Sequence, residues 1–133
     1  MDKIRIQRNI KQIEVNDEGE YITLDFNDQS LPYRFVQTMK DIYAKHQEFE
    51  KKISGGDNLY SVIELEHEIN LYFKEKIDLL LGKDTCRKVY GDILPSIEMH
   101  IDLLNQLTPY FEEYNKTRRE KMNKYNAGRT GNV

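Results

Sequence analysis

Two short stretches near the N-terminus carry apolar residues at alternating positions and predict a β-hairpin. Residues 21–26 place Ile22, Leu24 and Phe26 on one face of a strand, and residues 10–15 tolerate β-structure with an imperfect alternation. The turn between them reads Asn-Asp-Glu-Gly, residue types that accept the left-handed backbone of a tight turn. A lone hairpin is marginally stable in water, so this one must pack on helices or pair with another chain.

Apolar residues at helical spacing predict that the rest of the chain is mostly helical. Glycines and prolines divide it into three long helices and one short connector. The hairpin is expected over residues 10–26 and the helices over about residues 30–54, 57–81, 84–90 and 95–124. Pro109 lacks an amide hydrogen and lies inside the last helix, so a kink or break is expected near Leu107-Thr108.

Capping signals mark the expected helix ends. Asp28 or Ser30 can cap the first long helix, because a short polar side chain accepts a hydrogen bond from a free N–H of the first turn. Asp57 or Asn58 can do the same for the second. Gly82 follows an apolar helical run and is typical of a helix C-terminus.

The length and composition fit a single small α+β domain that is predominantly helical. The chain has 133 residues, of which 38% are hydrophobic and 32% are charged. The domain is expected over residues 1–125, with the N-terminal β-hairpin packed on the three long helices and the connector, followed by a disordered tail at residues 126–133. No apolar run approaches the roughly 20 residues that span a bilayer, which favours the cytoplasm.

No set of residues in the sequence forms an enzyme motif. A phosphate-binding glycine loop, a dinucleotide fingerprint, a nucleophile elbow and paired metal-binding cysteines are all missing. Glu64 and His67 share a helix face, and His46 and His100 could join them as metal ligands, but a solvated polar face is the favoured interpretation. Cys86, near a helix start, could have a lowered pKa, although a buried packing role is favoured. We therefore expect a protein without catalytic residues, cofactor or metal, which acts by binding a partner.

The charge is distributed unevenly along the chain. The net charge is −3, but residues 115–133 carry a local charge of +5 and residues 1–114 carry −8. The candidate phosphate-contacting residues are Lys116, Arg118, Arg119, Lys121 and Lys124. A solvated helix end is the plainer interpretation, and the acidic remainder argues against a nucleic-acid-binding domain.

Aromatic residues are a second candidate feature for binding. The chain has nine tyrosines and five phenylalanines. Most follow the helical stripes and belong to the predicted core. Tyr33, Tyr60, Tyr110 and Tyr125 fall off these stripes or at their ends, as tyrosines at interfaces do.

Two passages of the sequence resemble a known family. One covers residues 13–26, IEVNDEGEYITLDF, and continues to LPYRF at residues 31–35. The other runs from GKDTCRKVYGD at residues 82–92 through Pro95-Ser96 to LTPYF at residues 107–111. With this spacing the chain resembles the small tail assembly chaperones and related tail-region proteins of long-tailed phages and prophages of Gram-positive bacteria.

The resemblance implies a non-catalytic protein in the cytoplasm of the bacterial host. Such proteins coat an aggregation-prone, largely helical client, the tape measure or tail tube protein, and are absent from the finished tail. Amphipathic helices and the free hairpin edge can capture such a partner. The candidate partner-binding residues are Tyr21, Phe26, Tyr33, Phe35 and Tyr110. The basic extension after Tyr114 does not match the family pattern.

Two other functions stay open at this point. The first is a permanent structural component, such as a head–tail or tail-terminator protein, which would form a closed ring. The second is a small nucleic-acid-binding regulator that uses the basic C-terminal end. A homo-oligomer is compatible with each of these functions.

Overall fold

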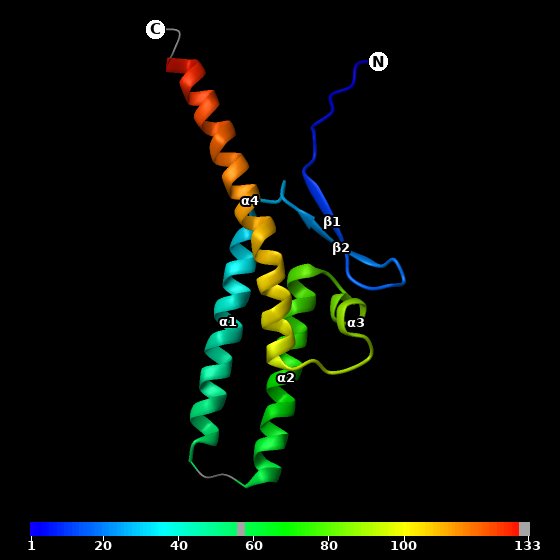
Figure 1. Ribbon diagram of the computed structural model, residues 1–133, viewed down its shortest axis with the longest axis vertical. Helices are drawn as coiled ribbons and strands as arrows, with labels where there is room; N and C mark the ends of the chain where they lie inside the picture. The colour runs from blue at the N-terminus through cyan, green and yellow to red at the C-terminus, as the bar shows by residue number, and fades with distance from the viewer. Residues whose placement is uncertain (56–57, 131–133) are drawn as a thin grey trace. The chain divides into compact units, whose positions relative to one another are not determined.

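The computed structural model describes residues 1–55 and 58–130, with side chains described to residue 128. These residues form a β-hairpin followed by four helices (Figure 1). The elements are β1 (Ile10–Glu14), β2 (Tyr21–Asp25), α1 (Ser30–Ile53), α2 (Leu59–Leu81), α3 (Thr85–Tyr90) and α4 (Ile97–Thr130). The predicted α+β, mostly helical fold is confirmed.

The hairpin buries one face against the helices. β1 and β2 pair antiparallel, with Ile13 opposite Ile22. Ile22, Leu24 and Phe26 are all buried, as the alternation of apolar residues predicts. β2 contacts α2, so the hairpin packs on a helix of its own chain. β1 is mostly exposed and forms the outer strand of the two.

The tight turn of the hairpin depends on an asparagine and a glycine. The Asn16 side-chain oxygen accepts hydrogen bonds from the backbone N–H groups of Glu18 and Glu20, at 2.9 and 3.2 Å. Gly19 has a φ of +81°, a conformation that side-chain-bearing residues rarely adopt. The predicted turn chemistry is therefore present at the predicted positions.

The helical core is formed by α1 and α2, which pack against each other along the chain's first unit (Figure 1). Their buried side chains are Leu31, Phe35, Thr38 and Ile42 in α1 and Ile69, Phe73, Ile77, Leu80 and Leu81 in α2. Apart from the adjacent Leu80 and Leu81, successive members lie three or four residues apart, which places them on one face of each helix. This is the spacing from which the helices were predicted.

The capping predictions can be assigned to particular residues. The N-cap position of α1 is Gln29, whose side chain makes no capping hydrogen bond, and Asp28 just before it accepts hydrogen bonds at Oδ1 from the N–H and the hydroxyl of Ser30 at 2.9 and 2.7 Å. Asn58 caps α2, since its Oδ1 accepts from the N–H of Ser61 at 2.9 Å. The alternative cap, Asp57, lies outside the described residues. Each described cap satisfies an N–H that has no partner within its helix.

The turn between α2 and α3 is built from short polar residues. Gly82 ends α2 with a φ of +116°, and its N–H donates to the Asp78 carbonyl at 3.0 Å. Asp84 has a left-handed φ of 68° directly before α3. The Thr85 hydroxyl donates back to the Gly82 carbonyl at 2.7 Å. The half-buried Asp78 side chain then accepts the Cys86 N–H at 2.9 Å, which places α3 beside α2.

The chain divides into two compact units, Met1–His100 and Ile101–Val133, and α4 begins in the first and fills the described part of the second. α4 continues through Pro109, so the predicted break does not occur. One proline removes a single hydrogen bond, and the rest of the ladder holds the helix together. The Thr108 hydroxyl also donates to the Leu104 carbonyl at 2.8 Å, a contact that commonly bends a helix.

The C-terminal end of α4 differs from the expectation. The helix extends to Thr130, where the sequence predicts an end near residue 124 and a disordered tail from 126. Residues 116–124 are mostly Lys, Arg, Glu and Met, which favour a helix even without a packing partner, and the helix continues to Thr130 although Asn126, Gly128 and Thr130 favour it less. The predicted absence of core residues there is nevertheless correct, since every side chain from 115 to 128 is exposed. Residues 131–133 lie outside the described residues.

Candidate functional site

The hairpin turn is attached to α3 by long-range polar contacts. The Asn16 side-chain amide donates to the Lys88 carbonyl at 3.0 Å, across 72 positions of sequence. Arg87 donates through both terminal nitrogens to the Glu20 carboxylate, at 3.3 and 2.9 Å. Hydrogen bonds from Arg87 and Asn16 hold the pKa of the Glu20 carboxyl below its ordinary value. The two passages that carry the family resemblance therefore contact each other here.

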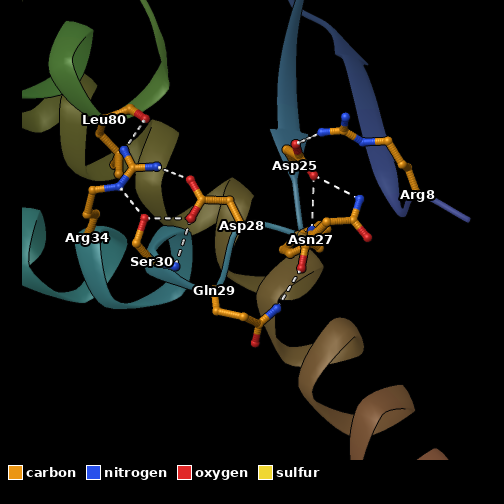
Figure 2. A network of polar contacts seen from close by, with 9 residues as sticks. Arg8, Asp25, Asn27, Asp28, Gln29, Ser30, Arg34 and Leu80 are labelled. Atoms are coloured by element: carbon orange, nitrogen blue, oxygen red, sulfur yellow. Dashed lines mark hydrogen bonds and ion pairs between the residues drawn. The ribbon is translucent and has the colours of Figure 1, made fainter. Parts of the chain in front are cut away.

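A second polar network joins the end of the hairpin to α1 and α2 (Figure 2). Arg34 donates to Asp28 Oδ2 at 3.2 Å, to the Ser30 hydroxyl at 3.2 Å and to the Leu80 carbonyl at 3.4 Å. Hydrogen bonds from Ser30, assisted by the charge of Arg34, lower the pKa of the Asp28 carboxyl. Arg34 thus connects the N-terminus of α1 to the C-terminal turn of α2.

The residues around Asp25 complete this network (Figure 2). Asp25 Oδ1 accepts from the backbone and the side-chain amide of Asn27 at 3.0 and 2.9 Å, and its other oxygen pairs with Arg8. Hydrogen bonds from Asn27 are the main reason why the pKa of Asp25 is lowered. Each carboxylate in the two networks has a donor partner, so their evident role is to anchor the hairpin.

The connector helix encloses a buried thiol. Cys86 is 1% exposed, and its Sγ lies 3.7 Å from the Lys74 carbonyl. Burial, with the nearby Asp78 carboxylate, raises the pKa of the Cys86 thiol to about 12. A helix N-terminus lowers the pKa of a thiol, but the pKa of Cys86 is raised, because desolvation is the larger effect here. Cys86 is buried, as the packing role requires, and its raised pKa argues against an activated nucleophile at this position.

His100 is the other buried titratable side chain. It is 0% exposed, its Nδ1 lies 3.0 Å from the Tyr90 hydroxyl, and the ring of Phe73 faces its edge. Burial lowers the pKa of His100 to about 4. Its Nε2 has no hydrogen-bond partner among the described residues. His100 is therefore neutral at physiological pH and belongs to the core.

The suggested metal ligands do not converge. His46 pairs with Glu50 of its own helix at 2.9 Å, and His100 is enclosed beside Tyr90. Glu64 and His67 are exposed on α2. Within residues 1–55 and 58–130, no three side chains of His, Cys, Asp or Glu are grouped as ligands for a metal ion.

The predicted partner-binding aromatics are divided by their burial. Tyr21 and Tyr33 are exposed, and Tyr110 is half-buried. Phe26 and Phe35 are each only 4% exposed, so their assignment to a binding surface is wrong for this conformation. Phe26 extends the buried face of β2, and Phe35 lies on the core stripe of α1. The spacing of Phe26 and Phe35 from the other apolar residues predicts that both are in the core. Their aromatic character alone was not a reason to assign them to a binding surface.

α1 carries a second apolar stripe on the face opposite the core. We call Tyr33, Val36 and Tyr43 the α1 outer stripe; Tyr33 is 70% exposed and the other two are also exposed. They lie three and seven residues apart, which gathers them within one side of the helix. Sequence reasoning identified Tyr33 but missed its two neighbours, although the spacing was visible.

α2 also has exposed apolar residues outside its buried positions, and two of them, Tyr60 and Leu71, lie opposite the core face. We call Tyr60, Ile63 and Leu71 the α2 outer stripe, and Leu79 continues it toward the C-terminus. A shallow depression lined by Leu71, Leu79 and charged residues lies at this end. Two helices with apolar residues on both faces are unusual for an isolated small domain, because water contacts the outer stripes.

The basic residues of the C-terminal end surround the helix. Lys116, Arg118, Arg119, Lys121 and Lys124 are all exposed. At 100° per residue they point to several sides of α4, and they do not form one continuous basic face.

Within the described residues, no helix has the length and apolar character to cross a membrane.

Comparison with known proteins identifies a family without a known activity. A family model described as a family of unknown function, DUF6673, matches residues 18–132, and the chain belongs to this family. No curated protein and no solved structure matches the chain.

Proposed function

We propose that this protein is a non-catalytic tail assembly chaperone of a phage or prophage. It binds the tape measure or tail tube protein in the bacterial cytoplasm and leaves before the tail is finished. The observation that carries the proposal is the α1 outer stripe, a set of exposed apolar side chains at helical spacing on a well-anchored helix. The choice of client rests on the resemblance of residues 13–26, 31–35, 82–92, 95–96 and 107–111 to the tail assembly chaperones.

The α1 outer stripe is suited to a helical client. Exposed apolar residues on one side of a helix bury the apolar face of a second helix, and the hydrophobic effect stabilises the contact. Val36 lies between two tyrosines whose hydroxyl groups can stay hydrated at the rim of such a contact. The core on the other side of α1 and the Arg34 network keep the helix in place without the client.

The free edge of β1 offers a second contact for an extended client segment. β1 pairs with β2 alone among the described strands, so its outer edge can accept another strand. Tyr21, the first residue of β2 and paired with Glu14 of β1, is exposed and adds aromatic area. The turn contacts between Asn16 and Lys88 hold the hairpin rigid, which lowers the entropic cost of strand addition.

Co-expression with the client tests the proposal. The tape measure protein from the same genome is produced alone, with the wild-type chain, and with the Tyr33→Asp/Val36→Asp variant. We expect the wild-type chain to keep the client in the soluble fraction and to elute with it, and we expect the variant to fail. The matched control is Ile93→Asp, which changes an exposed apolar residue in a loop away from the stripe.

The outcomes separate the proposal from its alternatives. A client that stays insoluble with the wild-type chain, or a double variant that works as well as the control, contradicts the proposal. Mass spectrometry of purified particles distinguishes a chaperone from a structural component, because only the structural component is present in finished tails.

A nucleic-acid-binding regulator is a second candidate, favoured by the exposed cations at the end of α4. Truncation after Tyr114 would then abolish DNA binding, and binding by the full chain would weaken steeply with salt. The spread of the cations around the helix and the acidic remainder favour the chaperone.

A further inference from the structure

α2 and the end of α4 carry opposite charges beside exposed apolar residues. From Leu59 to Phe73, α2 contains Glu64, Glu66 and Glu68 and no lysine or arginine. Residues 115–128 of α4 contain five basic residues and one acid. The hydrogen bonds and ion pairs that anchor the hairpin do not involve these residues, and Glu68 also borders a depression between α1 and α2 that Lys45 and Phe49 line from the α1 side.

The acidic residues of α2 lie along its outer stripe. Glu64 and Glu68 are one turn apart and next to Tyr60 and Leu71 on the helix surface, at 100° per residue. All four side chains are exposed. The stripe from Tyr60 to Leu71 is about 16 Å long, from a rise of about 1.5 Å per residue.

The end of α4 has the complementary arrangement. Met122 and Tyr125 are exposed at 51% and 59% and lie on one side of the helix. Arg118 and Lys121 border the same side, whereas Glu120 points to the opposite side. This surface therefore offers an apolar centre with a basic rim; from Arg118 to Tyr125 it is about 10 Å long, at about 1.5 Å per residue, so it can cover part of the α2 outer stripe.

We propose that the chain forms a two-fold symmetric dimer in which the C-terminal end of α4 of each copy binds the α2 outer stripe of the other. The second copy is the favoured occupant because both complementary surfaces belong to this same sequence. Two-fold symmetry makes the contact twice, which brings the interface toward the roughly 800 Å² per partner that specific dimers bury. The opposite charges set which surfaces meet, and the apolar residues stabilise the contact.

Charge reversal on each surface tests the dimer. The first variant is Glu64→Lys/Glu68→Lys and the second is Arg118→Glu/Lys121→Glu. Sedimentation equilibrium should give twice the 15.9 kDa chain mass for the wild-type protein. Each variant alone brings like charges together in both contacts, so we expect its dimer dissociation constant to rise about tenfold or more.

The mixture of the two variants is the decisive measurement. In the mixed dimer, wild-type α4 of the first variant meets wild-type α2 of the second, and the two reversed surfaces meet each other. Both contacts then join opposite charges, so an equimolar mixture should dimerise again. The control is Glu14→Lys/Glu18→Lys, which changes the net charge equally on the exposed hairpin and should leave the dissociation constant unchanged.

Three results would overturn the dimer proposal. They are a wild-type chain that stays monomeric at all concentrations, variants that dimerise like the wild-type chain, and a mixture that stays monomeric. Raising salt from about 0.1 M to about 1 M should also weaken the wild-type dimer, because the Debye length falls from ~10 to ~3 Å. The α1 outer stripe is unchanged in all these variants, so failure of the dimer and failure of the chaperone proposal are distinguishable.

Discussion

Acidification should destabilise the protein through His100 before it affects the carboxylates. The Tyr90 hydroxyl can donate to the Met99 carbonyl at 3.2 Å while His100 Nδ1 donates to that hydroxyl at 3.0 Å. In this arrangement the ring N–H of His100 and the hydroxyl of Tyr90 both have acceptors, and Nε2 of His100 keeps a lone pair without a donor. A second proton on Nε2 would place a buried N–H where no described side chain or backbone group accepts it.

The magnitude follows from the two pKa values. The pKa of His100 is about 4 in the folded chain and near the ordinary histidine value of 6.5 in the unfolded chain. The unfolded chain therefore binds the proton first as the pH falls. The stabilising contribution is complete above pH 6.5 and is lost progressively toward pH 4. The full loss is roughly 3 kcal/mol, and about 2 kcal/mol of it has occurred by pH 5.

Urea unfolding, followed by circular dichroism at pH 7.5 and pH 5.0, measures this loss. The His100→Gln variant has no titrating group at this position, so its unfolding free energy should change by about 2 kcal/mol less than that of the wild-type chain over this interval. His46 and His67 are present in both proteins and cancel in the comparison. Equal pH dependence in the two proteins would refute the reasoning.

Three further predictions follow from the buried thiol, the hairpin turn and the core. Cys86 should be unreactive toward a thiol reagent at pH 8 until the chain unfolds, because its thiol pKa is raised to about 12; rapid labelling of the folded protein would contradict this. Asn16→Ala should lower the unfolding free energy by about 1–2 kcal/mol, whereas Arg87→Ala should lower it by less, since its ion pair is exposed; chemical denaturation tests the order. Phe73→Ala, at a side chain 1% exposed, should cost about 3–5 kcal/mol in the same assay, and a cost below about 1 kcal/mol would argue against the described core.

The elements of the fold were predictable because their signals are local. Alternation marks β2, three- and four-residue spacing marks α1 and α2, and Asn58 and Gly82 end or begin helices by bonding only to neighbouring backbone groups. The end of α4 was predicted less well. The Lys, Arg and Glu residues there favour a helix, whereas the lack of a packing partner favours disorder, and the sequence alone does not show which effect is larger.

The candidate surface was predictable only in part. Tyr33 was identified from its position off the core stripe, and it is exposed. Val36 lies three residues later on the same side, so attention to a second apolar period would have found it. Phe35, between them in sequence, faces the core, because adjacent residues on a helix point about 100° apart.

The sequence by itself determined the hairpin, the helices and most of their boundaries, since each depends on hydrogen bonds and side-chain periods within a few residues. Only the tertiary structure decided how these elements are fixed to one another. Asn16 meets the Lys88 carbonyl and Arg34 meets the Leu80 carbonyl across long stretches of sequence. The opposite pKa shifts of Cys86 and His100 from their ordinary values arise in the same way, because burial depends on which segments pack around a side chain.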